Sequence, residues 1–343
     1  MSSLDTGSWR TASLGTVLLI ASPVLLFLLS FLIGRYPVMP LTVIKVIAAQ
    51  ALPITPDWSP TIESVVINVR LPRVIAAMTV GGGLAIAGAS YQGVFRNPLV
   101  SPFTLGVSAG AGFGAAAAIL LFGQRYAIQL CAFGGGLMAV ALCFAMSRFY
   151  RLNSTIVLVL GGVIVGSLFT ALLSLLKYVA DPNSKLPVIE FWLLGSLSSV
   201  AMKDIVPVLT VIVPAAAVLL MLRWRLNILA MGDEQARVMG VEAGQLRFVF
   251  ILFSTLIAAS AVSISGIIGW VGLVIPHFAR IVVGPDFRRL LPATLSLGAC
   301  YLLIIDDIAR TVTAAEVPLG VLTALMGAPV FILLLGRGGL GWA

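Results

Sequence analysis

The sequence predicts an all-α protein that crosses a membrane about ten times. Hydrophobic residues make up 60% of the 343 residues, charged residues only 10%, and the mean hydropathy is +1.10. A single soluble core cannot cover that much apolar surface in a chain of this length. Apolar runs also recur along the whole chain, and roughly 20 helical residues are enough to cross a ~30 Å hydrocarbon layer. We expect residues 1–343 to form one transmembrane domain.

The apolar runs and the polar residues between them locate the expected helices. The first run follows Arg10 and is too long for the core of a cleaved signal peptide, so we expect a membrane helix there. The predicted ranges are Thr11–Gly34, Arg70–Gln92, Phe103–Leu121, Ala127–Ser147, Thr155–Tyr178, Ile205–Leu222, Phe248–Ser265, Gly266–Val283, Leu290–Ile308 and Pro318–Leu335. Two stretches, Tyr36–Glu63 and Asp181–Lys203, are too polar to span, although Leu186–Leu197 is predicted to form a short interfacial helix.

Basic residues set the predicted orientation. The net charge is +8, and in a chain this apolar, topology and anionic lipid explain the charge better than nucleic acid does. Loops assigned to the cytoplasm are rich in arginine, and an even number of helices then leaves both termini in the cytoplasm. The arginines assigned to this side are Arg96, Arg148, Arg151, Arg223, Arg225, Arg237, Arg247, Arg280, Arg288 and Arg289.

The longest polar interruption in the second half of the chain is the segment 226–247. Asp233 is predicted to cap a short helix that stops at Gly240, and a second helix is expected to start near Val241. Composition alone favours a solvated loop between two membrane helices.

Signals of catalysis or nucleotide binding are missing from the sequence. The glycine patches Gly81–Gly83, Gly134–Gly136 and Gly161–Gly162 are not followed by the Lys-Ser/Thr pair of a phosphate-binding loop. His277 has no carboxylate or cysteine near it in sequence. Three cysteines lie in apolar runs without metal-ligand spacing and are expected to be packing residues: Cys131, Cys143 and Cys300. We therefore expect no enzyme, no metal site and no cofactor in this chain.

Acidic residues near the end of the chain are expected to be structural. Asp306 and Asp307 come one helical turn before Arg310 and can pair with it. Glu316 stands just before Pro318, where an acid suits the positive end of a helix.

A faint internal repeat links the two halves of the chain. Ala85–Gly88 and Ser263–Gly266 share a small-Ile-small-Gly pattern, and each is followed ten positions later by a proline, Pro98 or Pro276. In the predicted topology the two copies run in opposite directions, which is typical of an inverted duplication. Small residues also suit ordinary helix packing, so both interpretations stay open.

Several motifs, in order, resemble the FecCD-type permeases, the membrane subunits of bacterial ABC importers for iron-siderophores, haem and cobalamin. The resemblance covers the chain from about Glu63 to Gly336. The matching stretches are Arg70–Arg73, Gly88–Gln92, Phe95–Leu99, Leu105–Gly110, Gly232–Gly240, Gly269–Arg280, Asp307–Arg310, Pro318–Val321 and Gly327–Phe331.

The resemblance, which extends to the cobalamin importer permease, implies an architecture and a set of partners. It implies a type II ABC importer permease of ten helices in inverted-repeat halves, working as a homodimer in the bacterial inner membrane. Two separate ATPase subunits would bind on the cytoplasmic side and use ATP and Mg²⁺, and a periplasmic or lipid-anchored binding protein would deliver the substrate. Nucleic acid is not expected as a partner.

Site residues are also implied by the resemblance. Segment 226–247 would hold the coupling helices that meet the ATPases, through Met231, Gly232, Asp233, Glu234, Ala236, Arg237, Gly240 and Val241. Arg70, Arg73 and Arg310 would grip carboxylates of the binding protein, although arginines there can also anchor helices at the lipid head groups. A cytoplasmic gate is expected near Ser154 and Thr155, which can also be ordinary helix caps.

The expected cargo is an iron chelate, either a siderophore or haem, or cobalamin. The stretch Asp181–Leu197 departs from the commonest family pattern and leaves an oxyanion such as molybdate or tungstate as an alternative. An ion-coupled secondary transporter is a weaker alternative, because it should carry carboxylates at membrane depth.

Overall fold

The structure is a computed structural model that describes residues 6–34, 36–149, 155–313 and 315–336, with side chains from Leu18 to Leu333, and its regular elements are helices. By length and composition, six helices in this part of the chain can cross a membrane, and four shorter apolar helices accompany them. The six are Pro60–Phe95, α6 (Arg125–Phe149), α7 (Thr155–Val179), α9 (Met202–Met231), α11 (Ala243–Ser265) and α13 (Phe287–Ala309). The shorter ones lie in α1 (Thr6–Ser30), α5 (Val107–Leu121), α12 (Val271–Val283) and α14 (Leu319–Gly336). The all-α prediction is confirmed.

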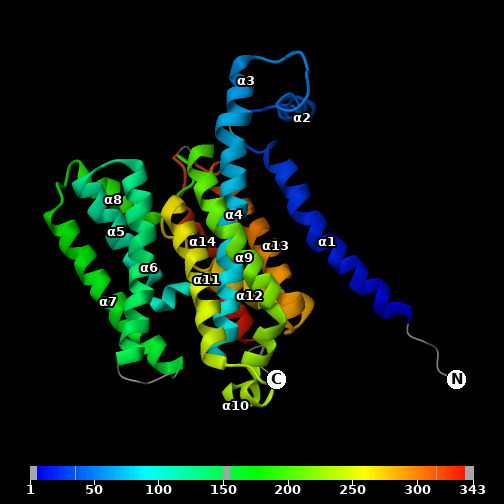
Figure 1. Ribbon diagram of the computed structural model, residues 1–343. Helices are drawn as coiled ribbons and strands as arrows, with labels where there is room; N and C mark the ends of the chain where they lie inside the picture. The colour runs from blue at the N-terminus through cyan, green and yellow to red at the C-terminus, as the bar shows by residue number, and fades with distance from the viewer. Residues whose placement is uncertain (1–5, 35, 150–154, 314, 337–343) are drawn as a thin grey trace.

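Helix α4 (Leu71–Phe95) is the axis of the larger bundle, with α9, α11, α12 and α13 packed around it (Figure 1). Its small residues allow backbones to approach closely, which is how helices pack in a membrane. A Cβ atom at Gly88 would lie 1.9 Å from the carbonyl oxygen of Gly272 on α12, and one at Gly81 would lie 2.3 Å from that of Gly298 on α13. These two glycines therefore cannot carry a side chain without moving a neighbouring helix.

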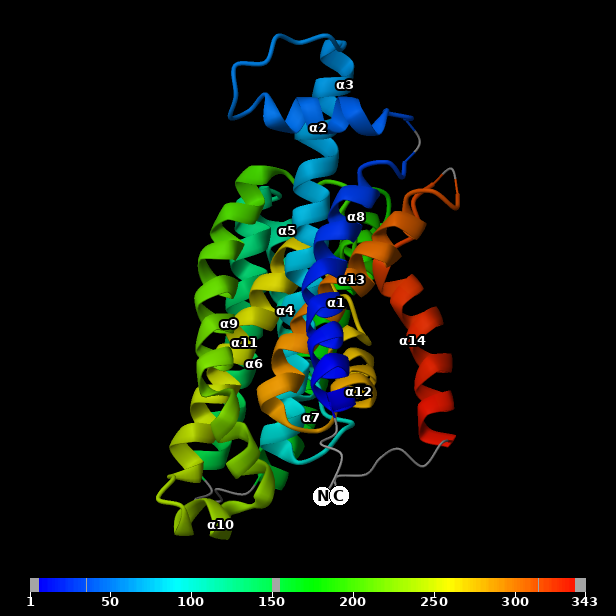
Figure 2. The ribbon, with the colours of Figure 1, turned by 90° about the vertical axis from the view of Figure 1, so that its right-hand side faces the viewer.

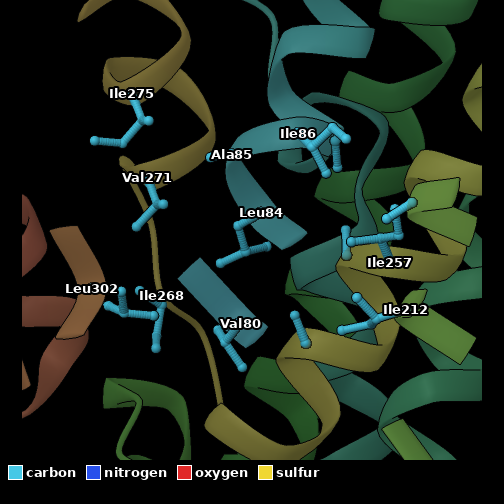
Figure 3. Packing of buried hydrophobic residues seen from close by; sticks show 14 of the residues in the cluster. Val80, Leu84, Ala85, Ile86, Ile212, Ile257, Ile268, Val271, Ile275 and Leu302 are labelled. Atoms are coloured by element: carbon cyan, nitrogen blue, oxygen red, sulfur yellow. The ribbon is translucent and has the colours of Figure 1, made fainter. Parts of the chain in front are cut away.

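The apolar core forms where these helices meet (Figure 3). Val80, Leu84 and Ile86 of α4 are at most 1% exposed, and their neighbours come from four other helices and the segment before α12. Those neighbours are Ile212, Ile257, Ile268, Val271, Ile275 and Leu302. Residues from distant parts of the sequence thus share one core around α4.

A second group of helices stands beside this bundle (Figure 1). It contains α5, α6, α7 and the short α8 (Lys185–Leu194). Helices α5 and α6 again meet through glycine, because a Cβ atom at Gly114 would lie 2.0 Å from the carbonyl oxygen of Cys131. On the outside, α1 packs against α13, and α14 lies across the molecule from α9 (Figure 2).

The two ends of the bundle carry different short helices (Figure 2). The α10 end holds α10 (Asp233–Val238), and the α2 end holds α2 (Pro40–Ala48), α3 (Pro60–Ser64) and the wide turn η1 (Val65–Arg70). The predicted start of the second helix at Arg70 was wrong, because the helix begins at Pro60 and runs through η1 into α4. Pro60 opens the first turn and the Ser59 hydroxyl accepts from the Ile62 amide at 3.3 Å, so capping starts the helix well before its apolar part.

The predicted helix Gly266–Val283 was wrong at its start. Helix α11 ends at Ser265, and α12 begins only at Val271. Gly266 has a φ of +68°, and a Cβ atom there would lie 2.2 Å from the carbonyl oxygen of Trp192. The amide of Ser196 donates to the Ser265 carbonyl at 2.8 Å. Backbone contacts with the end of α8 therefore break the helix.

Two other predictions on helix extent have clear outcomes. The sixth predicted helix continues past Leu222 to Met231, so the polar segment begins as a helical extension of α9. The short helix predicted at Leu186–Leu197 is present as α8. The repeat motifs lie on antiparallel helices, one in the middle of α4 and the other at the end of α11, and the inverted duplication stays a prediction.

Gly88→Ala should destabilise the fold, because the added methyl group has to push α4 and α12 apart. A cost of about 1–3 kcal/mol is typical of overpacking. Gly134→Ala is the matched control, since nothing lies within 4 Å of a Cβ atom there. We expect a lower melting temperature in detergent for Gly88→Ala alone, and equal melting temperatures would contradict the packing described here.

Candidate functional site

The first candidate region is the helix α10 with its two turns. Gly232, with a φ of +120°, precedes the helix, and Gly240, with a φ of +73°, follows it. The amide of Val241 donates to the Ala236 carbonyl at 2.9 Å, which closes the end of the helix as predicted. Asp233 is the first residue of α10 and makes no capping bond, so the prediction of an Asp233 cap was wrong.

Asp233 instead ties α10 to the next helix. Its two carboxylate oxygens accept hydrogen bonds from Arg247 Nη2 at 2.8 and 2.9 Å. Arg247 is 7% exposed, whereas the Asp233 side chain is 53% exposed. The ion pair therefore fixes an exposed helix to a buried arginine at the start of α11.

The base of α9 is fixed as well. Asn227 donates to Asp286 Oδ1 at 2.6 Å and accepts from the Phe287 amide at 3.0 Å, which links α9 to the start of α13. A Cβ atom at Gly232 would lie 3.2 Å from Nη1 of Arg96, the residue that ends α4 with a φ of 51°. Helix α10 is thus tied to α11 directly, and α9, which leads into it, is held to the start of α13.

The outer surface of α10 combines charge with exposed apolar groups. Met231 is 59% exposed, Val238 90% and Met239 57%, while Ala236 is fully buried beneath them. Charged residues Asp233, Glu234 and Arg237 are exposed around them. Val238 and Met239 were not among the predicted coupling residues, because the sequence does not show which apolar residues of a short helix are exposed. An apolar tip on a braced polar helix is suited to insertion into a partner protein.

The second candidate region is a charged cluster at the α2 end. Arg73 Nε lies 2.8 Å from Asp306 Oδ2, and Arg73 Nη1 lies 2.9 Å from Glu316 Oε1. Arg310 pairs with Asp307, as predicted from their spacing, and its Nη2 donates to the Ser30 carbonyl at 2.7 Å. The cluster ties α1, α4 and α13 to the loop before α14.

The three arginines predicted to dock a binding protein are buried, not exposed at the surface. Arg70, Arg73 and Arg310 are 3%, 6% and 7% exposed. Arg70 donates to the backbone carbonyls of Phe31 and Tyr36. Buried charges require partners, and here the chain supplies them. Glu316 was expected to act at a helix start, but it pairs with Arg73 instead. The Glu316 side chain is 32% exposed.

A cavity of about 640 Å³ opens beside this cluster, among α6, α8, α11 and the start of α14. Its polar side chains are five serines, one glutamine and two charged residues, namely Ser196, Ser198, Ser199, Ser263, Ser265, Gln129, Arg125 and Glu316. Arg125 also pairs with the buried Asp204, Nη2 to Oδ2 at 3.0 Å. The cavity can therefore hold a polar ligand against hydroxyl groups.

The predicted gate is only partly described. Ser154 lies outside the described residues. Thr155 begins α7 and lines a cavity of about 430 Å³ with Arg96 and Asn97, which lie just after α4. His277 is 4% exposed, with its ring centroid 6.4 Å from that of Phe331. Within the described residues no group of three His, Cys, Asp or Glu side chains could hold a metal ion.

A model of the FecCD transport family matches residues 19–337 of the chain. The chain belongs to the FecCD transport family. It is 40% identical to the molybdate import system permease protein MolB of Haemophilus influenzae over 328 residues, which cover 95% of this chain and 96% of the relative. It is 39% identical to the cobalamin import system permease protein BtuC of Halobacterium salinarum, over 84% of this chain and 77% of the relative.

A solved structure shares the fold of this FecCD-family chain. It is described as an inward-facing conformation of a metal-chelate type ABC transporter, with 38% sequence identity and a TM-score of 0.83. The match covers 93% of this chain and 97% of that one. The predicted family is confirmed, and the chain is an ABC importer permease of the FecCD type.

Asp306→Asn should destabilise this FecCD-family permease strongly, because it leaves the buried Arg73 guanidinium without its main counter-charge. Breaking a buried pair typically costs about 3–5 kcal/mol. Glu190→Gln is the control, since Glu190 and Lys177 form an ion pair whose side chains are 47% and 33% exposed. Thermal unfolding in detergent should separate the two variants, and similar melting temperatures would contradict a structural role for the cluster.

Proposed function

We propose that this chain is the membrane subunit of a binding-protein-dependent ABC importer in the bacterial inner membrane, with the α10 end and both termini in the cytoplasm. The observation that carries the proposal is the family match over residues 19–337. The orientation is supported by the arginines at the α10 end, including Arg96, Arg225 and Arg288, because short cytoplasmic loops are typically basic.

Energy would come from two separate ATPase subunits, which bind ATP and Mg²⁺, so this chain needs no cofactor of its own. In the homodimer, each copy of α10 would insert its exposed tip into a cleft on one ATPase subunit. Its ion pair with α11 and the attachment of α9 to α13 favour transmission of ATPase closure as a rigid movement. The coupling set is the predicted one, extended by Val238 and Met239.

A homodimer would form the transport pathway, which we place along α7, α8 and α14. Support comes from apolar residues exposed on these helices, such as Leu168, Phe191 and Leu325, at 52%, 69% and 66%. Thr155, at the α10 end of α7, fits a gate at the cytoplasmic mouth.

A binding protein would dock at the α2 end through carboxylates. Arg73 is the best suited of the three arginines, because one of its two partners, Glu316, is partly exposed and lies on a loop. An acidic group of the binding protein can exchange with Glu316 while Asp306 continues to neutralise Arg73. Arg70 and Arg310 would act mainly by holding α1 and α13 in place.

For the cargo we favour a tetrahedral oxyanion of the molybdate kind. The molybdate permease matches 95% of this chain, and serine side chains and Arg125 form part of the lining of the cavity at the α2 end. A metal chelate or cobalamin is the second candidate, favoured by the solved metal-chelate type transporter and the cobalamin permease.

Uptake into proteoliposomes that contain the complete complex tests both the class and the cargo. We expect ATP-dependent uptake of molybdate when the binding protein is present, with little uptake of ferric siderophore or cobalamin. Preferential uptake of a chelate would instead identify the second candidate as the cargo. Uptake that is indifferent to ATP would refute the importer itself.

Gly240→Ala should weaken coupling, because a non-glycine residue at a φ of +73° is strained by roughly 1–2 kcal/mol. Gly244→Ala is the control, since Gly244 lies in α11 with open space around its Cβ position. We expect transport per ATP hydrolysed to fall at least about fivefold in Gly240→Ala only. Normal coupling would return segment 226–247 to the role of a plain loop.

Glu316→Gln should tighten docking of the binding protein, because it removes the intramolecular competitor for Arg73. Using about 0.2–1 kcal/mol, the range for an exposed pair, as a lower bound for this partly buried one, the Kd should fall at least about 1.4- to fivefold. Surface plasmon resonance with the immobilised transporter measures this, with Glu190→Gln as the control. Unchanged or weaker docking of Glu316→Gln would argue against the exchange.

A further inference from the structure

A group of four arginines at the α10 end has no place in the proposed transport cycle. Arg223 and Arg225 flank Trp224 near the end of α9, and Arg288 and Arg289 open α13. Among the described residues, none of the four forms an ion pair. The cluster therefore presents positive charge that the described part of the chain does not neutralise.

Asp286, the acidic residue next to this cluster, does not balance the positive charge of the four arginines. Asp286 already accepts from the Asn227 side chain and from the Arg288 amide at 2.9 Å. Partial burial raises the pKa of Asp286, but these hydrogen bonds and the charges of Arg288 and Arg289 hold it below its ordinary value. One carboxylate thus faces several guanidinium groups.

Helix electrostatics do not explain the cluster either. Arg288 and Arg289 lie in the first turn of α13, where the helix dipole is positive and disfavours cations. Arginine at this position costs stability unless an anion accompanies it. Asp286 caps this end of α13, but its single carboxylate does not balance the charge of both arginines.

A cavity between the two helices shows where an anion can bind. It has a volume of about 540 Å³ and is lined by Leu220, Met221, Arg223, Trp224 and Arg288. Two cationic groups therefore line the same space as an indole ring and two apolar side chains. Arg225 and Arg289 do not line it; Arg225 instead lies over the Trp224 ring, with its Cζ atom 5.2 Å from the ring centroid.

The depth of the cavity matches the membrane surface. Helix α9 has 30 residues, so at ~1.5 Å per residue it is about 45 Å long and exceeds a ~30 Å hydrocarbon layer. Counted from Met202, roughly 20 residues fill that layer, and Arg223 then lies at its boundary. Tryptophan is also enriched at this level.

An apolar stripe leads away from the cavity into the membrane. Val206, Val213 and Met221 are 53%, 57% and 75% exposed, and their spacing puts them on one face of α9. This helix lies across the molecule from α14, away from the proposed dimer contact (Figure 2). The cavity thus joins a cationic pocket to a lipid-facing apolar surface.

We propose that this cavity binds an anionic glycerophospholipid of the inner leaflet, with its phosphate between Arg223 and Arg288 and an acyl chain along α9. The assignment to the inner leaflet rests on the orientation proposed above, whereas lipid binding itself does not. Arginine pairs phosphate oxygens in a bidentate manner, and basic pockets between membrane helices are known to select anionic head groups. The bound lipid would brace α9 and α13 just before α9 leads into α10.

Quenching of Trp224 fluorescence tests the proposal on the purified chain in nanodiscs, without ATPase or binding protein. The difference between wild type and Trp224→Phe isolates the signal of this residue among six tryptophans. We expect brominated phosphatidylglycerol to quench it at a much lower mole fraction than brominated phosphatidylcholine. Equal quenching by the two lipids would overturn the proposal, even if the transport function holds.

Two double variants with the same loss of charge separate a site from diffuse attraction. A basic residue at an anionic surface contributes about 1 kcal/mol, or about fivefold, so Arg223→Gln with Arg288→Gln should lower the preference for phosphatidylglycerol about 25-fold. Arg225→Gln with Arg289→Gln should retain it. Equal losses would overturn the proposal. If the first variant fails to fold, the wild-type lipid preference alone decides.

Inorganic phosphate distinguishes a lipid from a free anion. Added at millimolar concentration to the same nanodiscs, it should leave quenching by brominated phosphatidylglycerol unchanged, because the acyl chain contributes to binding. Displacement by phosphate at constant ionic strength would overturn the lipid assignment in favour of a soluble anion.

Discussion

Close backbone contact between α4 and its neighbours is the constraint on which the rest of the structure depends. Gly81 and Gly88 bring the backbone of α4 against carbonyl groups of α13 and α12. Lipid tails are as apolar as the helix surfaces, so helix association brings no hydrophobic gain. Van der Waals packing at such close contacts must stabilise the association instead. Once α4 is enclosed, its ends are held at fixed positions. Both candidate sites are built on those ends.

Helix α4 physically connects the two sites. At one end Arg73 pairs with Asp306 and Glu316, and at the other Arg96 lies against Gly232 before α10. Helix α4 thus spans the distance between the two regions as a single helix that is enclosed along its length. The same arrangement explains why the cluster is buried, since exposed pairs would add little to the rigidity of the axis.

The charged residues divide by burial into two kinds. Inside the protein Arg73 pairs with Asp306 and Arg310 pairs with Asp307, and these ion pairs hold helices together. Arg223 and Arg288 form no ion pair in the described part of the chain and line a cavity open to lipid or solvent. Charge counted from the sequence cannot separate these kinds, because both appear as arginines that flank membrane segments.

The sequence by itself determined the class, the family and most helices, because apolar length and motif order are local properties of the chain. It also located the stop of α10 at Gly240 and the pairing of Asp307 with Arg310, both set by short-range spacing. Only the tertiary structure decided that Asp233 binds Arg247, that Glu316 binds Arg73 and that Gly266 breaks a helix. These outcomes depend on residues brought together from distant positions, which periodicity along a chain does not encode.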